Sequence, residues 1–267
     1  MILFDAHVHI QKNFTLEHLF TAARANFSKQ LQEVSPGRPG IFFLLLTEVG
    51  NCDCFANLKN QATAARVYSL AGWRIAPTKE SESLLAIHDN RPEDRLFLLA
   101  GRQIVTAERR EVLALATTAK IRDGLSLLET VDTVRHQGGL AVLPWGAGKW
   151  LGKRGRLVEE FLKNANPEHL FVGDNGGRPI FWPRPSQFNT AASRSIRLLP
   201  GSDPLSLPGE MERIGSYGAM VEGKCSDDYP AESLKGLLTM RGGKITPFGR
   251  RLGVVHFFKT QLALRRR

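Results

Sequence analysis

Short runs of apolar residues alternate along the chain with longer segments in which apolar positions recur every three to four residues. The short runs have the length of buried strands and lie at 2–4, 41–46, 140–143, 170–172 and 196–199. The longer segments have the spacing of helices that bury one face, and they lie at 15–33, 55–71, 126–137, 157–164 and 230–238. This alternation predicts βα units and therefore an α/β fold of barrel type.

Two stretches depart from the alternation. Residues 73–115 hold short apolar pieces without a helical period, which predicts hairpin-like strands. The C-terminal segment 246–267 predicts a basic helix with an apolar stripe that docks on the body. That stripe consists of Phe248, Leu252, Val255, Phe258 and Leu262. No shift in composition marks a domain boundary, so we expect a single domain over 1–267.

Composition predicts a folded protein of the cytoplasm. Of the 267 residues, 42% are hydrophobic and 23% are charged, which excludes disordered and fibrous classes. The longest run of large apolar residues, Ile41 to Leu46, is far shorter than the roughly 18 residues that a membrane helix needs. The opening MILFDAHVHI has an acid and two histidines where a signal peptide needs basic and apolar residues. Three cysteines are too few for a disulfide framework.

The net charge of +10 comes mostly from the C-terminal segment. Residues 241–267 contain eight Lys and Arg and no acid, which leaves 28 basic and 26 acidic residues in the rest of the chain. The body is therefore near balance, and it carries no strong signal for nucleic-acid binding. A docked final helix explains the basic segment, and a helix lying on a membrane surface is the alternative.

Candidate chemistry begins at the end of the first predicted strand, in Asp5-Ala6-His7-Val8-His9. Side chains alternate along extended backbone, so Asp5, His7 and His9 point to one side. Two imidazoles on one side can hold a single metal ion. The alternative is a pair of half-buried histidines that cap the strand.

These residues resemble the opening motif of the PHP (polymerase and histidinol phosphatase) family of metal-dependent phosphoesterases. Further segments resemble later motifs of that family, and they lie at 45–49, 101–106, 137–144 and 199–205. The resemblance spans most of the chain. It implies a distorted (β/α)7 barrel with its site at the carboxyl ends of the strands. It also implies that His7, His9, Glu48 and Asp203 bind metal, with Asp5 and Gln103 as catalytic residues. Asp174, in the loop after the predicted strand 170–172, is a further catalytic candidate, and the alternative is that it caps a glycine turn.

The chain departs from the PHP pattern at several ligand positions. Val49 and Leu205 stand where the family has histidines, and neither side chain can bind metal. Gln103 replaces a glutamate, Glu111 replaces a histidine, and Leu143 or Pro144 replaces the histidine of a His-Pro pair. We therefore expect one divalent ion (Zn, Mn or Fe) rather than two or three, or no ion at all.

Two loops that follow predicted strands carry cations suited to an anionic substrate. Residues 144–156 combine glycines and two indoles with four cations, and residues 172–178 end in Arg178. We expect Trp145, Lys149 and Arg178 to bind substrate, because ammonium and guanidinium groups pair with phosphate or carboxylate. The alternative is that the indoles pack under a loop and the cations are solvated.

The sequence thus predicts a PHP-like metal-dependent hydrolase that acts on a phosphoester or a similar anionic ester of small size. The alternative is a catalytically inactive PHP-like barrel that serves as a ligand- or partner-binding module. Cys52 and Cys54 resemble half of a zinc site, but only Cys225 remains to complete it, so a thiolate site is disfavoured.

Overall fold

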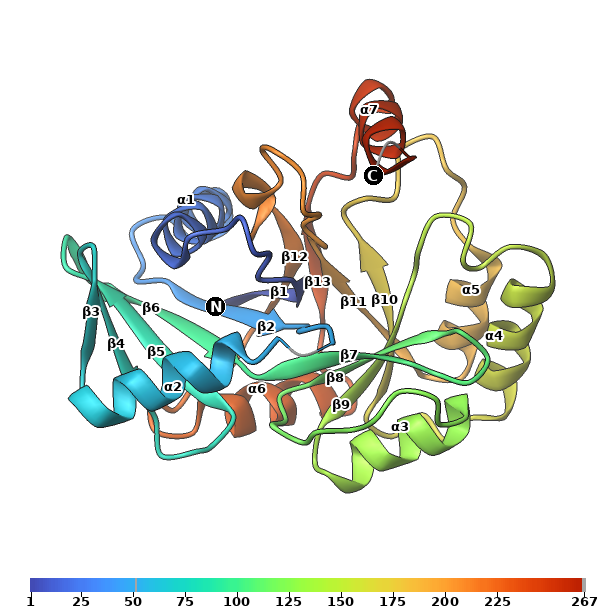
Figure 1. The fold of residues 1–267 in the computed structure, drawn as a ribbon, viewed down its shortest axis with the longest axis horizontal. Helices are drawn as coiled ribbons and strands as arrows, with labels where there is room; N and C mark the ends of the chain where they lie inside the picture. Colours follow the sequence, from blue (N-terminus) through green and yellow to red (C-terminus); the bar gives the residue numbers. More distant parts are fainter. Residues whose placement is uncertain (51, 266–267) are drawn as a thin grey trace.

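The computed structural model describes residues 1–50 and 52–265, and it is an α/β structure with two sheets between layers of helices (Figure 1). The larger sheet has eight strands in the order β13-β12-β1-β2-β6-β5-β4-β3. Their bounds are β1 Ile2–Val8, β2 Ile41–Leu46, β3 Tyr68–Leu70, β4 Trp73–Pro77, β5 Ser83–His88, β6 Arg91–Leu99, β12 Tyr217–Val221 and β13 Thr246–Gly249.

The smaller sheet has five strands in the order β11-β10-β9-β8-β7. Their bounds are β7 Gly101–Val105, β8 Glu111–Leu115, β9 Leu140–Pro144, β10 Leu170–Asn175 and β11 Arg197–Gly201. The helices are α1 Leu16–Val34, α2 Cys54–Ala65, α3 Leu127–His136, α4 Gly152–Asn164, α5 Ser186–Ser193, α6 Pro230–Thr239 and α7 Val254–Arg265, with a short 3-10 helix at Met211–Arg213. Among these helices, none combines the length and apolar character that a membrane crossing requires.

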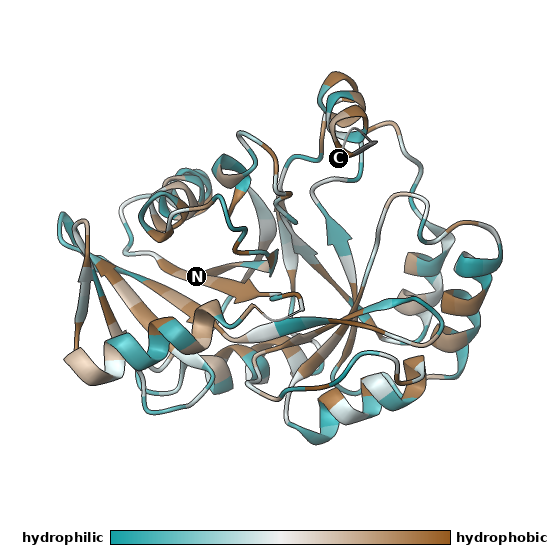
Figure 2. Ribbon diagram, in the orientation of Figure 1, coloured by the Kyte–Doolittle hydropathy of each residue, from teal (hydrophilic) through white to brown (hydrophobic). Residues whose placement is uncertain are grey.

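The central strands β2 and β9 are apolar along their whole length because both of their faces are buried. On β2, Phe42 and Leu44 pack against α1 and α2, whereas Phe43 and Leu45 face the core that the two sheets share. A third core lies between the smaller sheet and α3, α4 and α5. Figure 2 shows hydrophobic residues concentrated on the strands. This layering explains why the central strands appear in the sequence as continuous apolar runs.

The two sheets approach each other at two seams near the carboxyl ends of β1 and β2. At the first, the Asp203 amide donates to the His7 carbonyl at 2.9 Å, and a Cβ added to Gly201 would lie 2.4 Å from the His7 nitrogen. At the second, the Glu48 amide donates to the Gly101 carbonyl at 3.1 Å. The predicted α/β class is confirmed. A closed (β/α)7 barrel is not confirmed, because the described strands form two separate sheets.

The hairpin-like strands predicted within 73–115 are confirmed, since β4, β5 and β6 pair antiparallel in succession, as do β7 and β8. The helix predicted over 55–71 is shorter. It ends at Ala65 because Arg66 adopts a positive φ of 61°, and β3 follows. The structure also contains α5, for which the sequence pattern offered no prediction.

The C-terminal segment differs from its prediction. Thr246–Gly249 is a strand that pairs with β12, and helix α7 begins only at Val254. Phe248 is buried on that strand, whereas Val255, Phe258 and Leu262 are 67%, 59% and 52% exposed. The expected stripe therefore does not dock as one helical face, because Phe248 lies on a strand, Leu252 lies in the loop after it and only the other three residues lie on α7. On α7, Phe257 and Thr260 are buried instead.

Candidate metal centre

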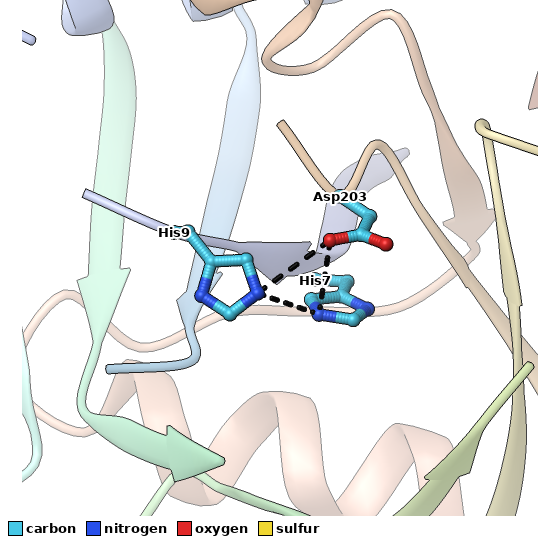
Figure 3. A group of neighbouring side chains, drawn as sticks. All are labelled: His7, His9 and Asp203. Atoms are coloured by element: carbon cyan, nitrogen blue, oxygen red, sulfur yellow. Dashed lines mark hydrogen bonds and ion pairs between the residues drawn. The ribbon is translucent and has the colours of Figure 1, made fainter. Parts of the chain in front are cut away.

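His7 and His9 converge at the end of β1. The register of β1 against β2 shifts between Asp5 and Val8, and the two rings then lie edge to face, with their Nε2 atoms 3.0 Å apart (Figure 3). Both residues are buried, at 5% and 8% exposure. The Nε2 atoms of His7 and His9 therefore lie close enough to bind one ion, on the same side of the chain as the alternation of side chains predicted.

Asp203 reaches the same point from the loop after β11. Its Oδ1 lies 3.5 Å from the Nε2 atoms of both His7 and His9 (Figure 3). The residue has a positive φ of 49°, a conformation that aspartate tolerates better than most residues. Its backbone amide is fixed on the His7 carbonyl, so the first seam between the sheets also positions this carboxylate.

The three donor atoms fit one metal ion. Bonds of about 2.0–2.1 Å to a tetrahedral ion place its ligand atoms about 3.3 Å apart, close to the 3.0 and 3.5 Å separations seen here. Three protein ligands leave a fourth position open, as in catalytic rather than structural sites. Two further contacts orient the donors: Thr47 Oγ1 lies 3.3 Å from His9 Nδ1, and Asn175 Nδ2 donates to Asp203 Oδ2 at 2.8 Å.

The protonation states suit metal binding. Burial lowers the pKa of His7 to about 4, so its imidazole is neutral at pH 7 and has a free electron pair. Burial raises the pKa of Asp203, but the two imidazoles beside it more than offset this and hold that pKa well below its usual range. The group thus offers neutral nitrogen and anionic oxygen, a donor set shared by Zn, Mn and Fe sites.

A pocket of about 360 Å³ opens onto these three residues. Three predicted site residues besides them line it, namely Gln103, Trp145 and Lys149. Lys149 Nζ contacts Glu111 Oε1 at 2.5 Å within the same pocket. Trp145 is buried and packs edge to face on Trp182. The structure thus brings together six of the ten residues that the sequence singled out.

Asp174 and Arg178 pair with each other instead of facing the pocket. Arg178 donates from Nε and Nη2 to the two Asp174 oxygens at 2.7 and 2.6 Å, and Tyr217 donates to Oδ2 at 2.9 Å. Both charges are buried and neutralise each other. Alternation along β10 turns Asp174 away and presents Asn175 to the pocket.

Asp5 and Glu48 also lie outside the group of three ligands. Asp5 accepts backbone N–H groups of Ser202 at 2.8 Å, Gly215 at 2.9 Å and His7 at 3.2 Å. Burial nevertheless raises its pKa to about 6. Glu48 Oε1 accepts the Phe55 amide at 2.7 Å and lies beside two cysteines. Both carboxylates thus accept hydrogen bonds from backbone N–H groups around the site.

We expect Asp5→Ala to lower the free energy of unfolding by about 3 kcal/mol or more, because buried N–H groups would lose their acceptor at about 1–3 kcal/mol each. Urea denaturation followed by circular dichroism measures this loss. Asp5→Asn is the matched variant, since it retains one acceptor oxygen and should lose less. Equal stability of Asp5→Ala and the unmodified chain would contradict this structural role.

Several pocket residues had no signal in the sequence. Arg213 is the last residue of the 3-10 helix Met211–Arg213, and Phe257, Thr260 and Gln261 come from α7. None of these residues directly follows a predicted strand, so the sequence pattern did not indicate them. Asn175 could have been found by that pattern, since it directly follows Asp174 at the end of β10.

Comparison with known proteins rests on structure alone, because no family model and no curated protein sequence matches the chain. The crystal structure of PsfC from Pseudomonas syringae PB-5123 is similar, with a TM-score of 0.60, 14% identity and 98% of both chains covered. The lesion-specific endonuclease PfuEndoQ from Pyrococcus furiosus has a TM-score of 0.50 at 13% identity. The match covers 91% of this chain and 57% of that one.

Endonuclease Q in complex with a 27-mer duplex substrate carrying an abasic lesion is a further neighbour, with a TM-score of 0.50, 12% identity, and 91% of this chain and 58% of that chain covered. At such identities the likeness concerns the fold alone. Endonuclease Q is a member of the PHP fold family. The chain is therefore PHP-like in fold, as its sequence motifs predicted.

Proposed function

We propose that the chain is a PHP-like metal-dependent hydrolase of phosphoesters or similar anionic esters. The observation that carries this proposal is the convergence of His7 Nε2, His9 Nε2 and Asp203 Oδ1 at one wall of a pocket that also holds cations. The likeness to an endonuclease supports a hydrolase fold without defining the substrate.

The chain's own residues prepare the site for attack by water. A divalent cation bound here supplies a Lewis acid and a water molecule of lowered pKa. His7 and His9 contribute neutral nitrogens, and the Asp203 carboxylate partly offsets the charge of the cation. Asn175 holds Asp203 Oδ2 and the Trp145 carbonyl, which fixes the carboxylate in the position needed for metal binding. Lys149 and Arg213 lie in the pocket, where they neutralise charge on an anionic substrate.

A single ion is the proposed stoichiometry. Val49, Gln103 and Leu205 line the same pocket, and two of these side chains have no ligand atom. Gln103 brings an amide but no charge to reduce repulsion between two cations. With the cysteines blocked, metal analysis by mass spectrometry of protein purified without chelator should therefore give close to one ion per chain.

The pocket favours a substrate of small size, since its volume of about 360 Å³ suits a small anionic molecule. The charge balance gave no strong signal for nucleic-acid binding, whereas one structural neighbour is an endonuclease bound to DNA. DNA phosphodiesters therefore join the candidate substrates, although helix α7 forms one wall of the pocket and narrows the approach for a duplex.

Hydrolysis assays test the proposal directly. Para-nitrophenyl phosphate, bis-para-nitrophenyl phosphate and a duplex with an abasic site represent a monoester, a diester and damaged DNA. We expect metal-dependent turnover of at least one ester that is lost in His7→Ala. No turnover of any ester by metal-loaded protein would favour the inactive binding module.

The binding-module alternative has its own supporting observation. Val49 and Leu205 give the pocket apolar walls at two positions where the resembling family has histidines. A pocket that no longer binds metal could still bind an anion through Lys149 and Arg213. Metal content equal to that of the buffer, together with retained binding of inorganic phosphate, would indicate this function.

We expect Lys149→Ala to raise the KM for an anionic ester about tenfold with a smaller change in kcat, because a half-exposed ammonium contributes about 1–2 kcal/mol to binding an anion. Lys153→Ala is the matched control, since Lys153 is exposed on α4 and absent from the pocket lining. Steady-state kinetics of both variants provide the measurement. Equal effects of the two substitutions would show that Lys149 acts only through overall charge.

A further inference from the structure

A second group of metal-binding side chains lies where β2 passes into α2. It consists of Glu48, Cys52 and Cys54, whose donor atoms all lie within 4.8 Å of one another. The two Sγ atoms are 3.1 Å apart, and Cys52 Sγ is 3.9 Å from Glu48 Oε1. None of the three lies in the group of His7, His9 and Asp203. The structure thus completes with a carboxylate the cysteine pair that the sequence left without partners.

The backbone fixes all three donors. The Glu48 amide donates to the Gly101 carbonyl, and its Oε1 accepts the Phe55 amide at 2.7 Å. The Cys52 amide donates to the Val49 carbonyl at 3.1 Å, which forms a turn. Cys54 is the first residue of α2. Glu48 lies two residues after β2, Cys52 lies in the loop that follows, and Cys54 begins α2, so the donors converge from the short connection between β2 and α2.

The geometry suits a tetrahedral ion after a small adjustment. Bonds of about 2.3 Å to sulfur and 2.0–2.2 Å to oxygen place two sulfur ligands about 3.8 Å apart and sulfur and oxygen about 3.6 Å apart. The Cys52 to Glu48 distance of 3.9 Å is already close to this. The sulfur atoms need to separate by about 0.7 Å. A Cβ added to Gly50, which has a φ of 55°, would meet no atom within 4 Å, so there is open space beside the cysteines for this adjustment.

The surrounding charges favour a bound cation. The cluster carries no positive charge of its own, since it consists of one carboxylate and two free cysteines. The nearby Asp53 is already paired with Arg102 and Lys120. Arg102 also donates to the Gly50 and Cys52 carbonyls at 2.5 and 3.4 Å, which steadies the turn from outside. A divalent ion with two thiolates and one carboxylate carries a net charge of −1, which this basic surrounding offsets.

We propose that Glu48, Cys52 and Cys54 form a second metal site, distinct from the histidine site, that binds a thiophilic ion of the zinc class. Two thiolates select such ions over Mg²⁺ or Mn²⁺. The three protein ligands leave the fourth position to water. Val49, between Glu48 and the cysteines, lines the pocket, so an ion here would also stabilise the wall beside the histidine site.

Cobalt titration of the full-length His7→Ala variant tests this proposal, because Co²⁺ bound to thiolates gives a charge-transfer absorption that Co²⁺ on histidine and carboxylate lacks. We expect one equivalent of Co²⁺ per chain to bind with that absorption, and Zn²⁺ to displace it. Adding Cys52→Ser or Cys54→Ser should abolish the absorption. Cys225→Ser is the matched control and should keep it, since Cys225 lies far along the chain after β12.

Two measurements exclude oxidation and unfolding as causes of a missing absorption. Thiol counting before titration establishes that the cysteines are reduced, and circular dichroism establishes that each variant is folded. Glu48→Gln should weaken Co²⁺ binding about tenfold while keeping the thiolate absorption. Absence of the absorption with all thiols reduced would overturn the proposal, as would its persistence in Cys52→Ser. Asp203→Ala, as a second background, should give the same titration as His7→Ala.

Discussion

With the cysteines blocked, replacing His7 or Asp203 with alanine should reduce the metal content from about one ion per chain to the level of the buffer, and should reduce ester hydrolysis by about a thousandfold or more. Each substitution removes one of only three protein donors that meet at one point. The departures at Val49 and Leu205 leave no neighbouring ligand to compensate. Mass spectrometry for metal content and steady-state kinetics measure the two effects.

Controls separate loss of the ion from loss of the fold. His18→Ala is matched to His7→Ala, since the His18 side chain is exposed and pairs with Glu212 at 2.7 Å, and the variant should retain both metal and activity. Asp203→Asn preserves shape but removes the charge, so it should bind metal more weakly. Retention of a full equivalent of metal at the histidine site in His7→Ala, with the cysteines blocked, would contradict the proposed ligand set.

Two truncations of the C-terminal segment should have very different effects. Ending the chain at Gly253 removes α7 but keeps β13 and the Leu252 contacts with Gly176 and Ile180. Ending it at Lys244 removes β13 as well, including Phe248, which is buried and packs against Phe27. Loss of such an aromatic residue alone costs about 3–5 kcal/mol. We expect chain 1–253 to fold and chain 1–244 to aggregate or unfold.

Thermal unfolding and ester kinetics of the two truncated chains measure this contrast. Chain 1–253 should lose the pocket wall made by Phe257, Thr260 and Gln261, so its KM should rise while its fold persists. If it unfolds as readily as chain 1–244, α7 is a docked structural helix, as the sequence pattern predicted. Binding of the full chain to anionic vesicles that is lost in chain 1–253 would support the membrane-surface alternative, for which the exposed Val255 and Phe258 provide the apolar contact.

The C-terminal segment also illustrates what sequence periodicity misses. Phe248, Leu252, Val255, Phe258 and Leu262 are spaced like one helical face, yet Phe248 belongs to a strand. A short strand at a sheet edge gains its stability from β12 and from the pocket for its aromatic ring, both distant in the chain. Spacing within the segment cannot show those partners.

The candidate site also combines relations that local sequence determines with contacts that only the folded chain makes. Alternation along β1 correctly placed His7 and His9 on one side, because extended backbone fixes that relation locally. The same rule included Asp5, but its carboxylate is held by the amides of Ser202 and Gly215, which only the folded chain brings near. Asp174 was a predicted catalytic residue, but it pairs with Arg178 and Tyr217, and the neighbouring Asn175 lines the pocket instead.

The sequence by itself determined the α/β class, most of the central strands and the histidine pair, because continuous burial and side-chain alternation are properties of neighbouring residues. Tertiary structure alone decided which distant groups join them. It brought Asp203 onto β1 through the first seam, turned Glu48 toward Cys52 and Cys54, and placed α7 beside the pocket. Those contacts depend on how two sheets pack, and sheet packing is set by side chains far apart in the chain.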